Sequence, residues 1–123
     1  MHVLAVDDDP DSLRLVQQVL ENAGSRVTIA GSVAEAMRAF ALEIPLVVVS
    51  DIGMPGDDGI ELMRRIRALP AEQGGRVPAA ALTAYARATD RAKVLGAGYM
   101  VHLAKPIEPE ELLAVVASLA RFG

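Results

Sequence analysis

Polar side chains suited to phosphate chemistry stand where the short apolar runs of this sequence end. Asp7 and Asp8 follow the first run, Asp51 the third, Thr83 the fourth and Lys105 the fifth. Carboxylate oxygens without histidine or cysteine ligands favour hard cations such as Mg²⁺ or Mn²⁺. If the run ends meet in the fold, the sequence predicts a cation site made of carboxylates.

Convergence of Asp7, Asp8 and Asp51 would be unfavourable without a cation, since each close carboxylate pair repels by roughly 4 kcal/mol at about 4 Å and an effective dielectric near 20. Mg²⁺ would relieve that repulsion and usually keeps coordination positions open for a substrate phosphate. Phosphoryl transfer also needs a nucleophile and further positive or hydrogen-bond-donating groups. We therefore interpret Asp51 as the nucleophile, with Lys105 and Thr83 as the additional catalytic groups.

Three other aspartates are better suited to helix caps and turns than to metal binding. Asp9 and Asp11 flank Pro10, a residue typical of helix starts, and Asp58 stands beside Gly59. We leave these three aspartates out of the predicted metal site.

The elements that would position these side chains follow from hydrophobic patterning. Continuous apolar or β-branched runs predict strands, and apolar residues at three- and four-residue steps predict helices. Strands are expected at 2–6, 26–30, 46–50, 77–82 and 100–103. Helices are expected from Pro10 to a stop at Gly24, from the N-cap Ser32 through Phe40, over 60–69, over 87–95, and from Pro109 through Leu119.

Five strands alternating with five helices predict βαβ units, and hence a parallel sheet with helices on both faces. This is a doubly wound α/β fold, in which sites form outside the carboxyl ends of the strands. All the candidate residues follow strands, so they would share that edge. We expect residues 1–123 to form one domain, because a chain of 123 residues can bury one sizeable core.

Composition argues against several other function classes. The formal net charge is −4, and the crowded Arg64, Arg65 and Arg67 have the helical spacing of a solvated face, so no nucleic-acid partner is expected. The apolar runs are far shorter than a bilayer span, so no membrane partner is expected. Cysteine is absent, which suits a reducing compartment, and we expect a cytoplasmic protein.

The motifs around the candidate residues resemble those of response regulator receiver domains over nearly the whole chain. Val6-Asp7-Asp8-Asp9 resembles the acidic pocket of that family, and Asp51-Ile52-Gly53-Met54-Pro55 with Asp58-Gly59 its phosphorylation loop. Leu82-Thr83-Ala84 resembles its switch threonine and Lys105-Pro106 its lysine.

The resemblance implies a flavodoxin-like sheet with strand order 2-1-3-4-5. It implies that Asp51 accepts a phosphoryl group from a phosphohistidine on a histidine kinase or phosphotransfer domain, and that Asp7, Asp8, Asp51 and the backbone carbonyl of Gly53 surround Mg²⁺ or Mn²⁺. It also implies a cis bond between Lys105 and Pro106. Phosphorylation would then switch the conformation of the domain for signalling or for a phosphorelay.

The position of the family's aromatic switch residue departs from the family pattern. The aromatic switch residue of the family lies three residues before the lysine, where this chain has His102. A histidine could act as the switch together with Thr83, or be an ordinary half-buried strand residue. The segment 98–106 is similar to receivers attached to hybrid sensor histidine kinases, which favours such a parent chain. The domain itself would then be a self-phosphorylating phosphoacceptor rather than a turnover enzyme, with its output partner left open.

Three alternatives use the same residues. Asp7-x-Asp9 superficially resembles the nucleophile motif of haloacid-dehalogenase-type phosphatases, but Asp11 stands where that family has Thr or Val. A calcium loop would need a bidentate Glu where this chain has Gln18. A degenerate receiver used only for docking would not need the complete acidic set.

Overall fold

The structure is a computed structural model of the 123-residue chain, and it describes the backbone of residues 1–53, 59–84 and 88–121. Side chains are described over the same ranges except for 88–91. Three residues of the predicted phosphorylation loop, Met54, Pro55 and Asp58, therefore lie outside the described residues.

Strands and helices alternate along the described chain. The strands are β1 (His2–Val6), β2 (Arg26–Ala30), β3 (Val47–Asp51), β4 (Ala79–Thr83) and β5 (Val101–Ala104). The helices are α1 (Pro10–Asn22), α2 (Val33–Leu42), α3 (Gly59–Arg67), α4 (Ala88–Ala97) and α5 (Pro109–Ala120), with a short 3₁₀ helix η1 (Ala71–Gln73) after α3.

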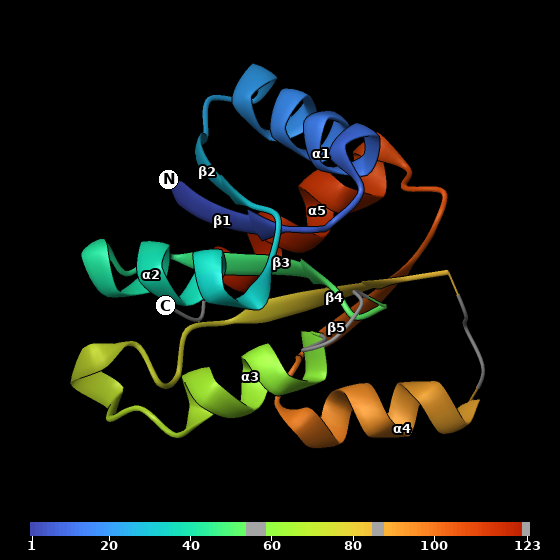
Figure 1. Ribbon diagram of the computed structural model, residues 1–123. Helices are drawn as coiled ribbons and strands as arrows, with labels where there is room; N and C mark the ends of the chain where they lie inside the picture. The colour runs from blue at the N-terminus through green and yellow to red at the C-terminus, as the bar shows by residue number, and fades with distance from the viewer. Residues whose placement is uncertain (54–58, 85–87, 122–123) are drawn as a thin grey trace.

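The strands form one parallel sheet in the order β2-β1-β3-β4-β5. The doubly wound fold and its strand order are thus confirmed. Helices α1 and α5 cover one face of the sheet, while α2, α3 and α4 cover the other (Figure 1). Parallel strands put all their carboxyl ends at one edge, so the residues that follow the strands share that edge.

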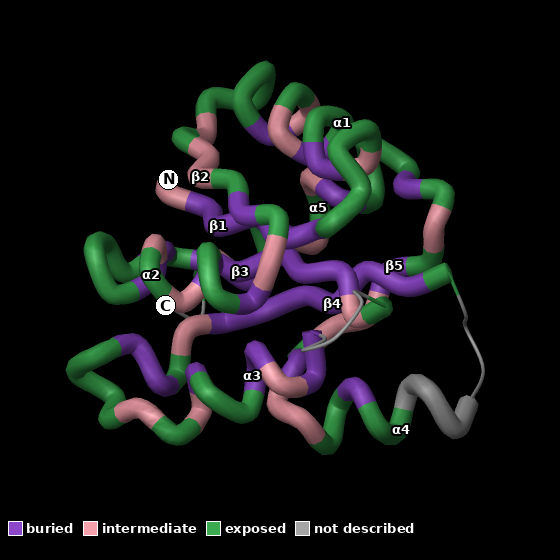
Figure 2. The backbone as a smooth tube through the Cα atoms, viewed as in Figure 1, coloured by how far each residue is buried: buried purple, intermediate pink, exposed green. Residues whose placement is uncertain are grey.

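The apolar core lies in two layers, one on each face of the sheet, and the inner strands β1, β3 and β4 are buried along most or all of their length (Figure 2). Successive residues of a strand point to opposite faces of the sheet, so alternate residues pack in the two layers. Val48 and Ala81 pack with Phe40 of α2 in one layer, and Val49 and Leu82 pack in the other. Strand β3 is buried at all five positions, which explains its continuous apolar run.

The helix-end signals behave as the sequence predicts. The Asp9 side chain caps α1 by accepting a hydrogen bond from the Asp11 amide, and the Ser32 side chain caps α2. Gly24 follows α1 with φ of 96°, a left-handed conformation that favours glycine. The strand ends at β3, β4 and β5 shift by one or two residues from expectation, and η1 was not predicted.

One prediction about surface charge is wrong in part. Arg64 and Arg65 are exposed as expected of a solvated helix face, but Arg67 is half-buried. Its guanidinium donates hydrogen bonds to the backbone carbonyls of Gly75, Val77 and Gly98. Helical spacing alone could not reveal this role, because the three carbonyls come from later parts of the chain.

Among the described helices, none has both the length and the apolar character needed to cross a bilayer.

Candidate functional site

The candidate residues all lie at the carboxyl edge of the sheet. Asp7 directly follows β1, Asp51 and Thr83 are the last residues of β3 and β4, and Lys105 directly follows β5. Backbone hydrogen bonds extend the sheet past the strand ends: the Asp7 amide donates to Ala30 over 3.1 Å, and the Lys105 amide donates to Thr83 over 2.8 Å. These bonds fix the backbone from which both site side chains project.

Three carboxylates meet at this edge. One oxygen each from Asp7, Asp8 and Asp51 lies within 4.8 Å of the other two. Asp7 and Asp51 are buried, with 2% and 7% of their surfaces exposed, whereas Asp8 is open to solvent. Two of the three oxygens therefore come from buried carboxylates and one comes from an exposed carboxylate. An ion bound there could keep water molecules among its ligands.

Lys105 supplies the positive charge of this cluster. Its Nζ lies 3.0 Å from Asp7 Oδ2 and 3.5 Å from Asp51 Oδ1. Burial alone would lower the pKa of Lys105, but the hydrogen bond to Asp7 and the charges of both carboxylates raise it. The lysine is thus held in its ammonium form beside the Asp51 carboxylate, where it can donate hydrogen bonds to an anionic ligand.

Asp51 sits in an environment that disfavours its negative charge. Burial and, secondly, the charge of Asp7 raise the pKa of Asp51, despite a 3.3 Å hydrogen bond from the Gly53 amide and the nearby Lys105. The hydroxyl of Ser50 donates a hydrogen bond to the backbone carbonyl of Asp51 over 3.0 Å. A cation bound beside Asp51 would therefore relieve an unfavourable negative charge.

This environment predicts that Asp51→Asn stabilises the metal-free protein at neutral pH by on the order of 1 kcal/mol. Because the folded pKa lies above 3.8, the protonated form favours the fold, and stability should fall as pH rises from 3.8 through the folded pKa. The variant should lack this part of the pH dependence. Urea unfolding in EDTA from pH 3.5 to 7.5 measures both effects, and a less stable variant at pH 7 would contradict them.

Thr83 and His102 lie on the same face of the sheet, in adjacent strands. Thr83 pairs with Ala104 in the register of β4 and β5, so His102 is two residues before its partner. Side chains two residues apart share a face. Thr83 is 2% exposed, and the Nε2 atom of His102 is buried without a hydrogen-bond partner among the described residues.

Other site predictions concern Asp9, Asp11, Pro106 and Gly53. Asp9 and Asp11 stand at the start of α1, where Asp9 is the N-cap as predicted, and the Asp9 amide donates to Asp7 Oδ1 over 2.9 Å. The Lys105-Pro106 bond is cis, as the resemblance implied. Gly53 is exposed, and its amide donates to Asp51 Oδ1 over 3.3 Å, while the role of its carbonyl stays a prediction.

The donor set fits a hard divalent cation. The three groups that could hold an ion are all carboxylates, two of them inner and one open to solvent, which is the chemistry that Mg²⁺ or Mn²⁺ prefers. Asp7, Asp8 and Asp51 would hold such an ion.

Sequence patterning missed a buried hydrogen bond close to the backbone of Asp51. The hydroxyl of Tyr99 donates to the carbonyl of Gly59 over 2.7 Å, across 40 residues of sequence. Gly59 in turn lies directly against the backbone of Asp51. The only signal in the sequence was the Asp58-Gly59 pair of the phosphorylation-loop motif, which does not point to Tyr99.

A family model and several known proteins resemble this chain over most of its length. A family model described as the response regulator receiver domain matches residues 3–117. An uncharacterized 14.6 kDa protein of Leptolyngbya boryana is 46% identical over 116 residues, which cover 94% of this chain and 87% of that protein. The solved structure of a putative response regulator from Chloroflexus aurantiacus superposes with a TM-score of 0.91 at 32% identity, covering 98% of this chain and 97% of the other.

A third relative is much longer than this chain. The signal transduction histidine-protein kinase BarA of Escherichia coli (strain K12) is 41% identical over 113 residues, which cover 91% of this chain and 12% of the kinase. With the parallel sheet and the acidic cluster at its carboxyl edge, these matches show that the chain belongs to the response regulator receiver domain family of two-component signalling.

Proposed function

We propose that residues 1–123 form one phosphoacceptor domain, in which Asp51 takes a phosphoryl group from a phosphohistidine donor in the presence of Mg²⁺ or Mn²⁺. The observation that carries this proposal is the meeting of three carboxylates within 4.8 Å, with Lys105 Nζ 3.5 Å from Asp51 Oδ1. A nucleophile, a place for a cation and a fixed ammonium group are the parts that phosphoryl transfer requires.

The chemical step needs few protein groups. A carboxylate oxygen of Asp51 forms a bond to phosphorus, while the bond from phosphorus to the donor nitrogen breaks and its electron pair leaves with the imidazole. Lys105 lies where it can donate hydrogen bonds to the phosphoryl oxygens, and Thr83 ends the neighbouring strand. When bound, Mg²⁺ would supply further positive charge to the same oxygens.

Phosphorylation would then act as a conformational switch through Thr83 and His102. Both residues occupy the α4 face of the sheet on adjacent strands, which is the arrangement that a coupled rearrangement needs. A ligand or modification shifts such an equilibrium only by interacting differently with the two states. A hydrogen bond from the Thr83 hydroxyl to the new phosphoryl group would provide that difference.

The partners follow from the family and its relatives. Receiver domains work with histidine kinases or phosphotransfer domains, and one relative of this chain is part of a histidine kinase. We therefore propose such a donor, a cytoplasmic setting, and either a stand-alone receiver or a hybrid kinase as the natural context.

Intact-mass spectrometry of the wild-type protein tests the proposal. Incubation with acetyl phosphate and MgCl₂ is expected to add one phosphoryl group, about 80 Da, to most of the protein. The adduct should disappear when EDTA replaces MgCl₂, and MnCl₂ should restore it. A protein that gains no mass with either metal, although folded by circular dichroism, would contradict the proposed function.

A further inference from the structure

The residue Tyr99 lies in the connection between α4 and β5, and its side chain reaches the first residue of α3. Its side chain is 2% exposed, and its hydroxyl donates to the carbonyl of Gly59 over 2.7 Å. Gly59 is the first residue of α3. A phenylalanine ring would fill the same buried space as the tyrosine ring. The hydroxyl therefore matters for its hydrogen bond to Gly59 and not for packing.

Gly59 is pressed against the backbone of the acceptor residue. A Cβ atom added to Gly59 would lie 2.4 Å from the Asp51 carbonyl oxygen and 2.8 Å from Ile52 Cα, so no side chain fits between them. Real Cβ atoms do not approach backbone this closely. The start of α3 therefore forms the support behind the peptide that carries Asp51 into the site.

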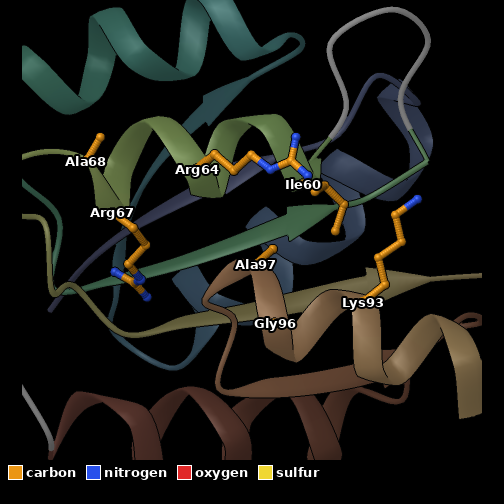
Figure 3. A pocket seen from close by; sticks show the side chains of 7 residues that line it. All are labelled: Ile60, Arg64, Arg67, Ala68, Lys93, Gly96 and Ala97. Carbon is orange, nitrogen blue, oxygen red and sulfur yellow. The ribbon is translucent and has the colours of Figure 1, made fainter.

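The other end of α3 is anchored separately. The Arg67 guanidinium donates from Nη2 to the carbonyl of Gly98 over 2.8 Å, and from Nη1 to Val77 over 2.8 Å. Figure 3 shows Arg67 leaving the C-terminal end of α3, with α4 running alongside. Two consecutive residues, Gly98 and Tyr99, thus hold the two ends of one helix.

From this arrangement we propose that the Tyr99 hydroxyl is a positioning residue for phosphorylation: by holding Gly59, it fixes the backbone of Asp51 in the geometry that accepts the phosphoryl group. This rests on the proposed function of Asp51. If the hydroxyl is removed, Arg67 still anchors the C-terminal end of α3, and only the end behind Asp51 gains freedom. The Tyr99 ring also packs in the core layer on the α2, α3 and α4 face of the sheet, and phenylalanine would keep that packing.

Small displacements of a nucleophile are costly in transfer reactions, where a misplacement near 1 Å can reduce rates about a hundredfold. A gain of a few tenths of an ångström in freedom should cost less. We expect Tyr99→Phe to lower the rate constant of phosphorylation by acetyl phosphate about fivefold at saturating Mg²⁺. The variant should remain folded over the temperature range of the assay.

A matched variant separates positioning from general loss of stability. Thr28→Val removes one hydroxyl that bonds His2 Nε2 over 2.8 Å, at the strand β2 and away from the carboxyl edge. It costs one side-chain hydrogen bond, as Tyr99→Phe does, but leaves the support of Asp51 intact. Thr28→Val is expected to phosphorylate at the wild-type rate, within about 1.5-fold.

The experiment measures rate constants of adduct formation by intact mass for the three proteins, alongside their urea unfolding curves. A fivefold slower Tyr99→Phe with an unchanged Thr28→Val supports the proposal. Equal rates for all three proteins, or equal slowing of both variants, overturn the positioning role while leaving Asp51 as the acceptor. A wild-type protein that takes no phosphoryl group overturns both the proposed function and this inference.

Discussion

Replacing Asp51 by asparagine is expected to abolish the phosphoryl adduct, with at least a hundredfold loss in the rate of mass gain from acetyl phosphate. The amide has nearly the size of the carboxylate but cannot form an acyl phosphate. Asp51 is 7% exposed and lies beside Lys105 Nζ, so no solvent-exposed carboxylate can take its place in the same geometry. A time course of intact masses in MgCl₂ measures the loss.

Asp9→Asn is the matched control for this prediction. Asp9 belongs to the same acidic stretch as Asp7 and Asp8, but its carboxylate caps α1 and hydrogen-bonds the Asp11 amide. Asparagine caps helices about as well as aspartate, so the fold should be unaffected. The Asp9→Asn protein should gain the adduct at the wild-type rate. Adduct formation in Asp51→Asn at a comparable rate would show that another residue is the acceptor.

The second large effect is expected at Lys105. Lys105→Met keeps the length and most of the volume of the side chain but removes the ammonium group 3.0 Å from Asp7 and 3.5 Å from Asp51. Loss of one fixed donor to a developing negative charge typically costs about a hundredfold in rate. We therefore expect phosphorylation to slow about a hundredfold, while Asp51 still takes the adduct after long incubation.

Mg²⁺ binding distinguishes this loss from collapse of the site. Without the ammonium group, the three carboxylates lack a fixed counter-charge, so calorimetric titration should show Mg²⁺ bound at least as tightly as in the wild type. Lys93→Met, which changes the exposed lysine of α4, should alter neither quantity. If Lys105→Met is phosphorylated at the wild-type rate, Lys105 has no role in phosphoryl transfer.

Much of the architecture was predictable because each element carries its own local signal. The buried run that became β3, the cap at Ser32 and the glycine after α1 are decided by residues next to one another in sequence. Parallel strands then place their carboxyl ends together by geometry alone. The convergence of Asp7, Asp8 and Asp51 followed from that rule and from no single motif.

Contacts between distant segments were not predictable from local patterns. The periodicity of α3 put Arg67 on a solvated face, whereas the structure puts its guanidinium among carbonyls that belong to Gly75, Val77 and Gly98. The hydrogen bond from the Tyr99 hydroxyl to Gly59 likewise joins residues 40 positions apart in sequence. Periodicity identifies the side of a helix, but not the backbone groups that later segments bring to it.

Chemical mapping can identify directly which residue carries the phosphoryl group. Borohydride converts an aspartyl phosphate into homoserine, and tandem mass spectrometry of a proteolytic digest then locates the converted residue. After treatment with acetyl phosphate and MgCl₂, the proposed chemistry predicts homoserine at position 51 and aspartate at positions 7, 8 and 9. Homoserine at any of those three positions, with position 51 unchanged, would contradict the acceptor role of Asp51.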